Sequence, residues 1–111
     1  MKHLLFLVAI GFLATTASAQ ITVSVSGSTG ADRASMNGVE TAGGGTFELA
    51  GNIIINGKIY NYADGPAWID GDCRFYLITL GDGWILSGEI CSDGSTSLTV
   101  WQVGGNSIDL T

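Results

Sequence analysis

Residues 73–91 read Cys-Arg-Phe-Tyr-Leu-Ile-Thr-Leu-Gly-Asp-Gly-Trp-Ile-Leu-Ser-Gly-Glu-Ile-Cys, and this stretch decides the fold class. Two β-prone runs, 73–80 and 84–91, flank a Gly-Asp-Gly turn, which is the pattern of an antiparallel hairpin. If the runs pair across the turn, Cys73 and Cys91 lie opposite each other at the open end. We therefore expect a disulfide between the only two cysteines, which would stabilise the fold by roughly 3 kcal/mol.

Short β-prone runs separated by glycine, asparagine and aspartate continue on both sides of this hairpin. Residues 96–103 and 107–110 extend it into a C-terminal meander. Upstream, Ile53-Ile54-Ile55 and Lys58-Ile59-Tyr60 flank Asn56-Gly57, a dipeptide that adopts the positive φ angles of a type I′ hairpin turn.

The other segments complete an all-β pattern. Residues 21–26 and 46–50 are predicted strands, 28–35 is a predicted polar loop, and a short strand is expected near Val39. No segment has the apolar spacing of an amphipathic helix. The sequence predicts one all-β domain over 20–111, a small antiparallel sandwich or barrel with a C-terminal meander and one disulfide.

Apolar alternation along these strands predicts the buried core. The expected members are Val23, Val25, Phe47, Leu49, Ile54, Phe75, Leu77, Ile78, Leu80, Trp84, Leu86, Ile90, Leu98, Val100 and Trp101. Where a strand carries apolar side chains on both faces, alternation does not tell which face is inward.

Residues 1–19 have the composition of an export signal. Lys2 and His3 form a basic start, 4–14 is an apolar run, and Ala17-Ser18-Ala19 is a small-residue cleavage site. The run is shorter than the ~20 apolar residues that span a membrane. We expect a signal peptide over 1–19 that is removed, no membrane insertion afterwards, and a secreted or extracytoplasmic protein, either periplasmic or extracellular.

Charge and residue usage exclude several functions. The chain has 4 basic and 10 acidic residues and a formal net charge of −6, so its few scattered cations cannot neutralise a run of phosphates or an anionic membrane surface. The only histidine, His3, lies in the expected signal peptide. The mature chain thus lacks the usual general base and the usual zinc ligand, and we predict that it is not an enzyme.

The densest aromatic stretch covers residues 60–68. Tyr60 and Tyr62 share one strand face, and Trp68 follows a turn at Gly65-Pro66. Exposed rings beside asparagine and aspartate suit the recognition of a sugar or a peptide, which makes Tyr60, Tyr62 and Trp68 the candidate ligand-binding residues. The alternative is that these rings cover the edge of a small β core.

Acidic turns offer a second kind of site. Asp70-Gly71-Asp72 and the segment 93–97 present the oxygen ligands that calcium prefers, so Asp70, Asp72 and Asp93 are calcium candidates. Residues 92–97 partly resemble the calcium loop of βγ-crystallins, with Ser92 where that loop has an acid or an amide. The alternative is that Asp-Gly simply forms tight turns, in which case no cofactor is needed.

A wider resemblance follows the order of several short motifs. They are Val25-Ser26-Gly27, Met36-Asn37-Gly38-Val39, Tyr60, Gly83-Trp84-Ile85-Leu86 and Trp101. This order resembles a small, poorly characterised β module of secreted or surface proteins in algae and other microbial eukaryotes, with the pattern V-S-G, N-G-x-Y, a Tyr-bearing strand, G-x-W-x-I and a late Trp. Glu40 stands where that pattern has tyrosine. The resemblance implies a β fold and export, and carries no chemistry.

Three classes of function fit these observations. Size, acidity, the disulfide and the missing catalytic base favour a non-catalytic extracellular binding module for a glycan or a protein surface. The first alternative is a structural or self-assembling surface protein, with Ile53-Ile54-Ile55 beside an exposed edge as the adhesive segment. A small hydrolase that uses carboxylates, with Asp70 and Asp72 as the closest acidic pair, is the third.

Overall fold

The computed structural model describes residues 19–111, so the expected signal peptide lies outside the described residues except for its last one, Ala19. Within residues 19–111 the chain forms nine β-strands, and no helix there is long and apolar enough to cross a membrane. The strands are β1 (Ala19–Thr29), β2 (Asp32–Gly43), β3 (Thr46–Ile55), β4 (Lys58–Asp64), β5 (Trp68–Asp70), β6 (Cys73–Thr79), β7 (Trp84–Cys91), β8 (Thr96–Gln102) and β9 (Ser107–Leu110).

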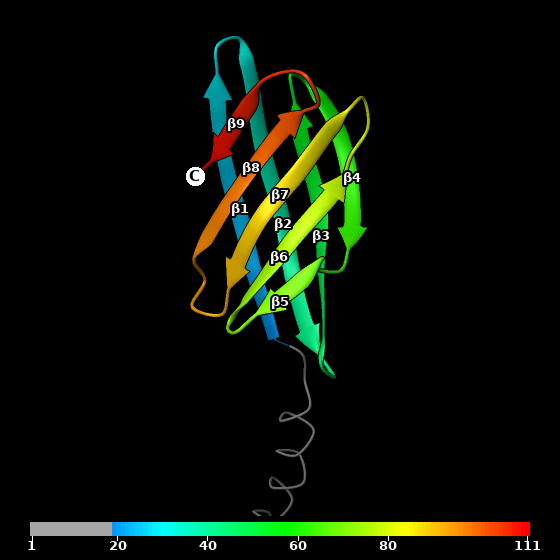
Figure 1. The fold of residues 1–111 in the computed structure, drawn as a ribbon, viewed down its shortest axis with the longest axis vertical. Coiled ribbons are helices and arrows are strands. Elements are labelled where there is room, and N and C mark those ends of the chain that lie inside the picture. The colour runs from blue at the N-terminus through cyan, green and yellow to red at the C-terminus, as the bar shows by residue number, and fades with distance from the viewer. Residues whose placement is uncertain (1–18) are drawn as a thin grey trace, which may run out of the picture.

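The strands form two antiparallel sheets that pack face to face. One sheet has the order β1-β2-β3-β4 and the other β5-β6-β7-β8-β9, and Figure 1 shows the second sheet in front of the first. Main-chain hydrogen bonds join the two sheets along the β1–β9 side of the sandwich. The N–H of Ser26 donates to the Thr111 oxygen at 3.1 Å, and the N–H of Thr111 donates to the Ser26 oxygen at 2.9 Å. The expected all-β fold with a C-terminal meander is confirmed.

Both predicted hairpins form where the turn chemistry places them. Asn56 and Gly57 have φ angles of 51° and 85°, and Asp82 and Gly83 have φ angles of 58° and 82°. Positive φ is favourable for glycine and tolerated by asparagine and aspartate. The two turns therefore fix the register of β3 with β4 and of β6 with β7.

The N-terminal half is more regular than its sequence suggests. Residues 28–35 were expected to form a loop, but most of them lie in strands, and β2 runs without interruption over Asp32–Gly43. The expected strands 46–50 and 53–55 are one strand, β3. The predictions were wrong because Met36 is the one large apolar residue among the inward positions Ala34, Met36, Gly38 and Glu40 of β2, so apolar alternation is hardly visible there.

The core lies between the two sheets. Its fully buried members include Met36, Leu49, Ile53, Tyr76, Leu86, Ile90, Val100 and Ile108. Seven expected core residues are not fully buried. Ile54 and Leu77 are exposed and Phe75 is half-buried, whereas their neighbours Ile53, Ile55, Tyr76 and Ile78 point inward. Val25, Phe47, Leu80 and Trp101 are also only half-buried.

Two aspartates tie the turns of one sheet to those of the other. Asp32 accepts hydrogen bonds from the side-chain amides of Asn56 and Asn106 at 2.9 and 2.5 Å. Asp82 accepts from the Lys58 ammonium at 2.6 Å and from the Tyr60 hydroxyl at 2.7 Å. These contacts hold the pKa of each aspartate below its usual value and stabilise the carboxylate form.

Candidate functional site

The outer face of the β5–β9 sheet carries a group of apolar side chains that the core does not use. Successive residues of a strand point to opposite faces, and burial alternates accordingly along β6 and β7. We call this surface the aromatic face; its apolar members are Trp68, Phe75, Leu77, Ile85 and Trp101.

Trp68 is the most accessible ring of the aromatic face. It lies opposite Phe75 across β5 and β6, and the two rings stack with centroids 4.1 Å apart and planes 8° from parallel. Trp68 is nevertheless 55% exposed. Because Phe75 covers one side of the indole, the exposed area lies on its other side and edge, which leaves a fixed aromatic surface open to a ligand.

A second indole lies at the opposite corner of the same face. Trp101 on β8 pairs with Ile85 on β7, and its ring N–H donates to the Ser87 hydroxyl at 3.1 Å. Trp101 lies three strands away from Trp68 and four residues further along the strand direction, which corresponds to a diagonal of about 20 Å. The exposed Leu77 lies between these corners, so the aromatic face is an extended platform.

Polar groups without positive charge fill the space between the rings. Glu89 pairs with Phe75 on one side and with Ser97 on the other, and Ser87 pairs with Leu77 and Thr99. Hydroxyl and carboxylate groups beside aromatic rings can accept and donate hydrogen bonds to a ligand that stacks on the rings. The three basic residues in the described part of the chain, Arg33, Lys58 and Arg74, lie on other surfaces or in the interior.

The structure separates the three predicted ligand-binding residues. Tyr62 is only 8% exposed and donates its hydroxyl hydrogen to the main-chain oxygen of Asn37 at 3.2 Å, so its ring belongs to the core. Tyr60 packs against the core and hydrogen-bonds to Asp82. Trp68 lies on the aromatic face, so the two tyrosines and the tryptophan do not form one binding surface.

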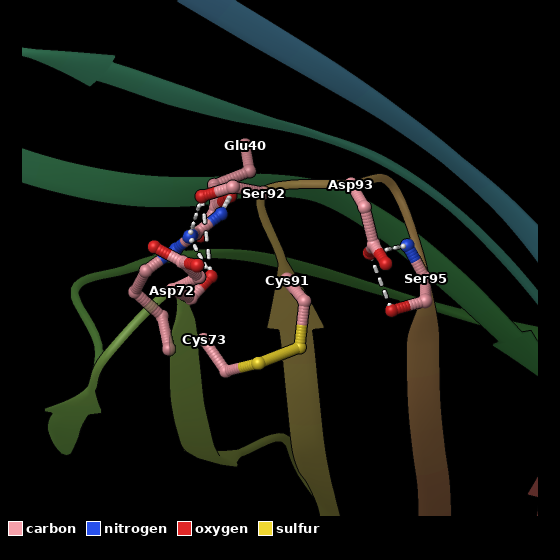
Figure 2. Close-up of a disulfide and its surroundings, with 8 residues drawn as sticks. Glu40, Asp72, Cys73, Cys91, Ser92, Asp93 and Ser95 are labelled. Atoms are coloured by element: carbon pink, nitrogen blue, oxygen red, sulfur yellow. Dashed lines mark hydrogen bonds and ion pairs between the residues drawn. A yellow bond between two sulfur atoms is a disulfide. The ribbon is translucent and has the colours of Figure 1, made fainter.

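The calcium candidates lie at the end of the sandwich that carries the disulfide, Asp72 and Asp93 on turns and Asp70 as the last residue of β5. One oxygen of the Asp93 carboxylate accepts hydrogen bonds from the main-chain N–H and the hydroxyl of Ser95, at 2.9 and 2.6 Å, as Figure 2 shows. These bonds lower the pKa of Asp93. The Asp72 main-chain oxygen accepts from Ser92 and from Arg74, and Asp70 is exposed.

These three carboxylates do not converge on one point. In residues 19–111, the acidic and thiol ligand atoms that gather within 4.8 Å of one another are those of Cys73, Glu89 and Cys91. Both of those sulfurs are in the disulfide, so this group offers one carboxylate and no thiolate.

The disulfide between Cys73 and Cys91 forms as expected and joins β6 to β7 (Figure 2). The two cysteines are directly paired in the register of the hairpin, and the residues that follow them, Arg74 and Ser92, both contact the Asp72 main-chain oxygen. The bridge thus holds together the two strand ends that surround the Arg74 side chain. A disulfide of this kind is typical of an oxidising, extracytoplasmic environment.

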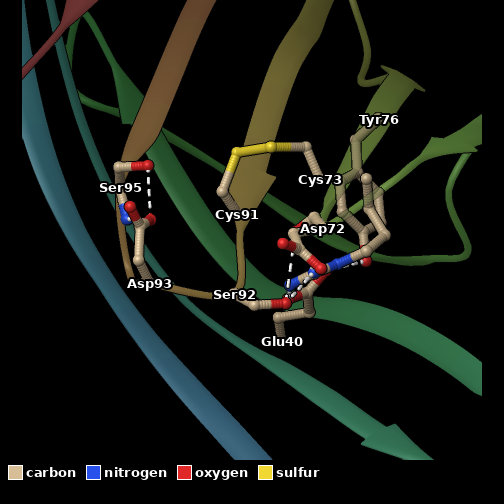
Figure 3. Close-up of polar contacts among 9 residues, drawn as sticks. Glu40, Asp72, Cys73, Tyr76, Cys91, Ser92, Asp93 and Ser95 are labelled. Atoms are coloured by element: carbon tan, nitrogen blue, oxygen red, sulfur yellow. Dashed lines mark hydrogen bonds and ion pairs between the residues drawn. A yellow bond between two sulfur atoms is a disulfide. The ribbon is translucent and has the colours of Figure 1, made fainter.

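A buried ion pair lies beneath the disulfide. Arg74 and Glu40 are each 2% exposed, and the guanidinium of Arg74 donates from both Nε and Nη2 to the two carboxylate oxygens of Glu40, with the Nε contact at 3.0 Å. Glu40 also accepts from the Tyr76 hydroxyl at 2.6 Å (Figure 3). The Phe47 ring lies over the guanidinium at 4.5 Å.

Every charge in this cluster has a partner. The hydrogen bonds to Glu40 raise the pKa of Arg74, and burial together with the Glu40 contact raises the pKa of Tyr76 above its usual range. No buried side-chain nitrogen or oxygen in residues 19–111 lacks a hydrogen-bond partner. The cluster therefore has the character of a structural element rather than of a reactive site.

Two hollows lie away from the aromatic face. One of about 250 Å³ opens above the ion pair and is lined by Ile21, Ala42, Phe47 and neighbouring residues. The other, of about 480 Å³, is a wide depression beside the Asn56-Gly57 turn. Asp70 and Asp72 line neither hollow.

Trp68 is predictable from the sequence, whereas Phe75, Leu77 and Trp101 were expected in the core. Their strands carry apolar residues on both faces, so alternation alone does not show which face is buried. The available signal was the pairing of Trp68 with Phe75, which follows once the Asp70-Gly71-Asp72 segment is taken as a tight turn between two strands.

Comparison with known proteins gives no further guide to the site, since no family model, curated protein or solved structure matches the chain.

Proposed function

We propose that this chain is an exported, non-catalytic binding module that recognises a neutral glycan through the aromatic face. The observation that carries the proposal is the Trp68 ring, which Phe75 holds by stacking and which is still 55% exposed. A sugar ring presents apolar C–H faces and a rim of hydroxyls, and a fixed indole beside hydroxyl and carboxylate groups complements both.

The charge of the face supports a ligand without phosphate, sulfate or carboxylate groups. Glu89 lies in the middle of the face, and no arginine or lysine among residues 19–111 borders it. An anionic glycan would be repelled there, whereas a neutral or amino sugar would not. The extended arrangement of Trp68, Leu77 and Trp101 suits a chain of sugar units better than a single one.

Export remains part of the proposal. The Cys73–Cys91 bridge supports an oxidising compartment, and the composition of residues 1–19 supports a signal peptide. The resemblance to the secreted β module of microbial eukaryotes points the same way. Calcium is a further prediction, since Asp72 and Asp93 are exposed at the same end of the sandwich (Figure 2) and the exposed Asp70 pairs with Cys73 at that end.

Isothermal titration with soluble neutral oligosaccharides tests the proposal directly. We expect at least one of a set of gluco-, xylo-, manno- and chito-oligosaccharides to bind the wild type, and the Trp68→Ala variant to lose about tenfold or more in affinity, since one stacked ring typically contributes 1–3 kcal/mol. Ile54→Ala is the matched control, because Ile54 is an exposed apolar residue on the outer face of the other sheet.

Each outcome of this titration has a meaning. Loss of binding in Trp68→Ala with retention in Ile54→Ala supports the aromatic face. Equal binding by both variants places the site elsewhere, and no binding of any oligosaccharide by the wild type contradicts a neutral glycan as ligand. Repeating the titration with added calcium or with a chelator shows whether the ion contributes.

A further inference from the structure

The free edge of β4 is a surface to which nothing above assigns a role. Within residues 19–111, β4 pairs with β3 only, and Figure 1 shows it at the right-hand edge of the molecule. An unprotected edge strand offers main-chain donors and acceptors to another strand.

The Asn56-Gly57 turn determines which main-chain groups point outward. A two-residue hairpin turn is closed by a hydrogen-bonded pair, here Ile55 with Lys58, and such pairs alternate along an antiparallel ladder. Lys58, Tyr60, Tyr62 and Asp64 therefore bond to β3. The N–H and C=O groups of the residues between them, Ile59, Asn61 and Ala63, point away from β3.

These outward groups have no partner elsewhere in the described chain. None of the main-chain hydrogen bonds outside the strand ladders of residues 19–111 involves Ile59, Asn61 or Ala63, and all three residues are exposed. Ile59 is 59% exposed, the largest value for a large apolar residue inside a strand of residues 19–111. The edge is thus a row of main-chain groups beside an uncovered isoleucine.

We propose that β4 pairs edge to edge with β4 of a second copy of this chain, antiparallel and centred on Asn61. In this register Asn61 lies opposite Asn61 of the partner, and Ile59 lies opposite the partner's Ala63. Each of these outward residues exchanges both of its main-chain hydrogen bonds, as the hydrogen-bonded pairs of an antiparallel ladder do. The pairing joins the two four-stranded sheets into one continuous sheet.

Charge complementarity favours this register. Lys58 begins β4 and Asp64 ends it, so an antiparallel copy centred on Asn61 places each Lys58 opposite the partner's Asp64 at both ends of the interface. The Lys58 side chain already contacts Asp82 and is 63% exposed, so it lies at the edge where a second carboxylate can approach. Opposite charges on directly paired residues stabilise a ladder.

Neighbouring registers lack these contacts. Centring the pair on Ala63 places Tyr60 opposite the partner's Pro66 and moves Lys58 beyond the paired region. Centring it on Ile59 leaves Asp64 unpaired. A row of polar residues crosses the outer face of the first sheet: Ser24, Asn37, Asn52 and Asn61. Among these registers, only the one centred on Asn61 joins this row to the same row of the partner.

Analytical ultracentrifugation of the purified protein over micromolar to millimolar concentration tests the pairing. We expect a reversible monomer–dimer equilibrium in the wild type. Asn61→Pro removes the central N–H, which does not bond within the chain, and a proline is tolerated on the solvent side of an edge strand. We expect it to weaken dimerisation by about tenfold or more. Asn61→Ala is the matched comparison, since it changes the same side chain but keeps the main-chain N–H, and it should dimerise clearly more tightly than Asn61→Pro.

Symmetric cross-linking keeps the test decisive if Asn61→Pro fails to fold. Hydrogen-bonded antiparallel pairs have Cα atoms about 5.5 Å apart, within the span of a disulfide. Asn61→Cys should therefore form a covalent dimer under mild oxidation, and Asn37→Cys, on the same row but in a central strand, should not. A wild type that sediments as a monomer at every concentration, an Asn61→Pro variant that dimerises like the wild type, or equal cross-linking of the two cysteine variants overturns the proposal. Its outcome is independent of glycan binding, which is measured on the opposite sheet.

Discussion

Glu40→Gln removes the negative charge of the buried ion pair and keeps the shape of the side chain. In the folded protein the Glu40 carboxylate accepts hydrogen bonds from Arg74 and Tyr76. The Arg74 guanidinium, 2% exposed, would keep its charge without a counter-charge. Breaking a buried pair in this way typically costs about 3–5 kcal/mol.

That loss is large for a domain of this size. Domains of this kind unfold with free energies of about 5–15 kcal/mol, and each kcal/mol changes the melting temperature by about 4–8 °C. We therefore expect Glu40→Gln to melt at least about 12 °C below the wild type at neutral pH. Urea denaturation followed by circular dichroism gives the free energy itself.

Two further variants separate the ion pair from other effects. Glu48→Gln makes the same chemical change at an exposed position and should alter stability by less than about 0.5 kcal/mol. The triple variant Glu40→Met, Arg74→Met, Tyr76→Phe replaces the whole cluster by apolar groups and should recover most of the loss. A loss below about 1 kcal/mol in Glu40→Gln would refute this reasoning, as would a triple variant no more stable than the single one.

Three other predictions concern the covalent link, the seam of the sandwich and pH. Replacing both half-cystines by alanine should lower the free energy of unfolding by roughly 3 kcal/mol, and reductant should then no longer change the melting temperature. Gly27→Ala should destabilise the fold by at least about 1–3 kcal/mol in urea denaturation, because its Cβ would lie 2.0 Å from the Asp109 main-chain oxygen; the control Gly65→Ala has its nearest contact at 3.6 Å and should behave like the wild type. Burial raises the pKa of Tyr62 to about 12, against about 10 in an unfolded chain. Its contribution to stability is therefore complete below about pH 10 and is lost as the pH rises toward 12; phenolate absorbance should show Tyr62 ionising later in the native protein than in urea, and coincident titrations would contradict this.

Turn chemistry was the part of the fold that the sequence predicted best. Asn56-Gly57 and Gly81-Asp82-Gly83 adopt conformations that few other residues favour, so they determine hairpins without knowledge of the rest of the fold. The disulfide followed from the second hairpin, because pairing across the turn brings Cys73 opposite Cys91.

The inward face of each strand was harder to predict. In β2 the inward positions hold alanine, methionine, glycine and glutamate, and the glutamate is acceptable there only because Arg74, 34 residues later, supplies the opposite charge. In β6, Arg74 shares its face with Tyr76 and Ile78. A local pattern cannot show that a charged face is the buried one when the partner is distant in sequence.

The candidate site was only partly predictable for the same reason. Trp68 was found because it is aromatic and follows a proline turn, but the burial of Tyr62 depends on the space above Gly38, where a Cβ would lie 2.5 Å from the Tyr62 hydroxyl. That space exists only once β2, β3 and β4 are packed together, so the spacing of residues along the sequence does not reveal it.

In the described part of the chain, the only passage from one sheet to the other is between β4 and β5, through Gly65 and Pro66, and every strand ladder joins consecutive strands. Few pairings therefore require distant segments to meet, and topologies with local contacts fold fast for their class. Each half can form its hairpins alone, but each then exposes an apolar face that only the other half covers. A chain cut at Gly65 should thus give two fragments that are unstable apart and reassemble when mixed, with the Ser26–Thr111 hydrogen bonds joining them again.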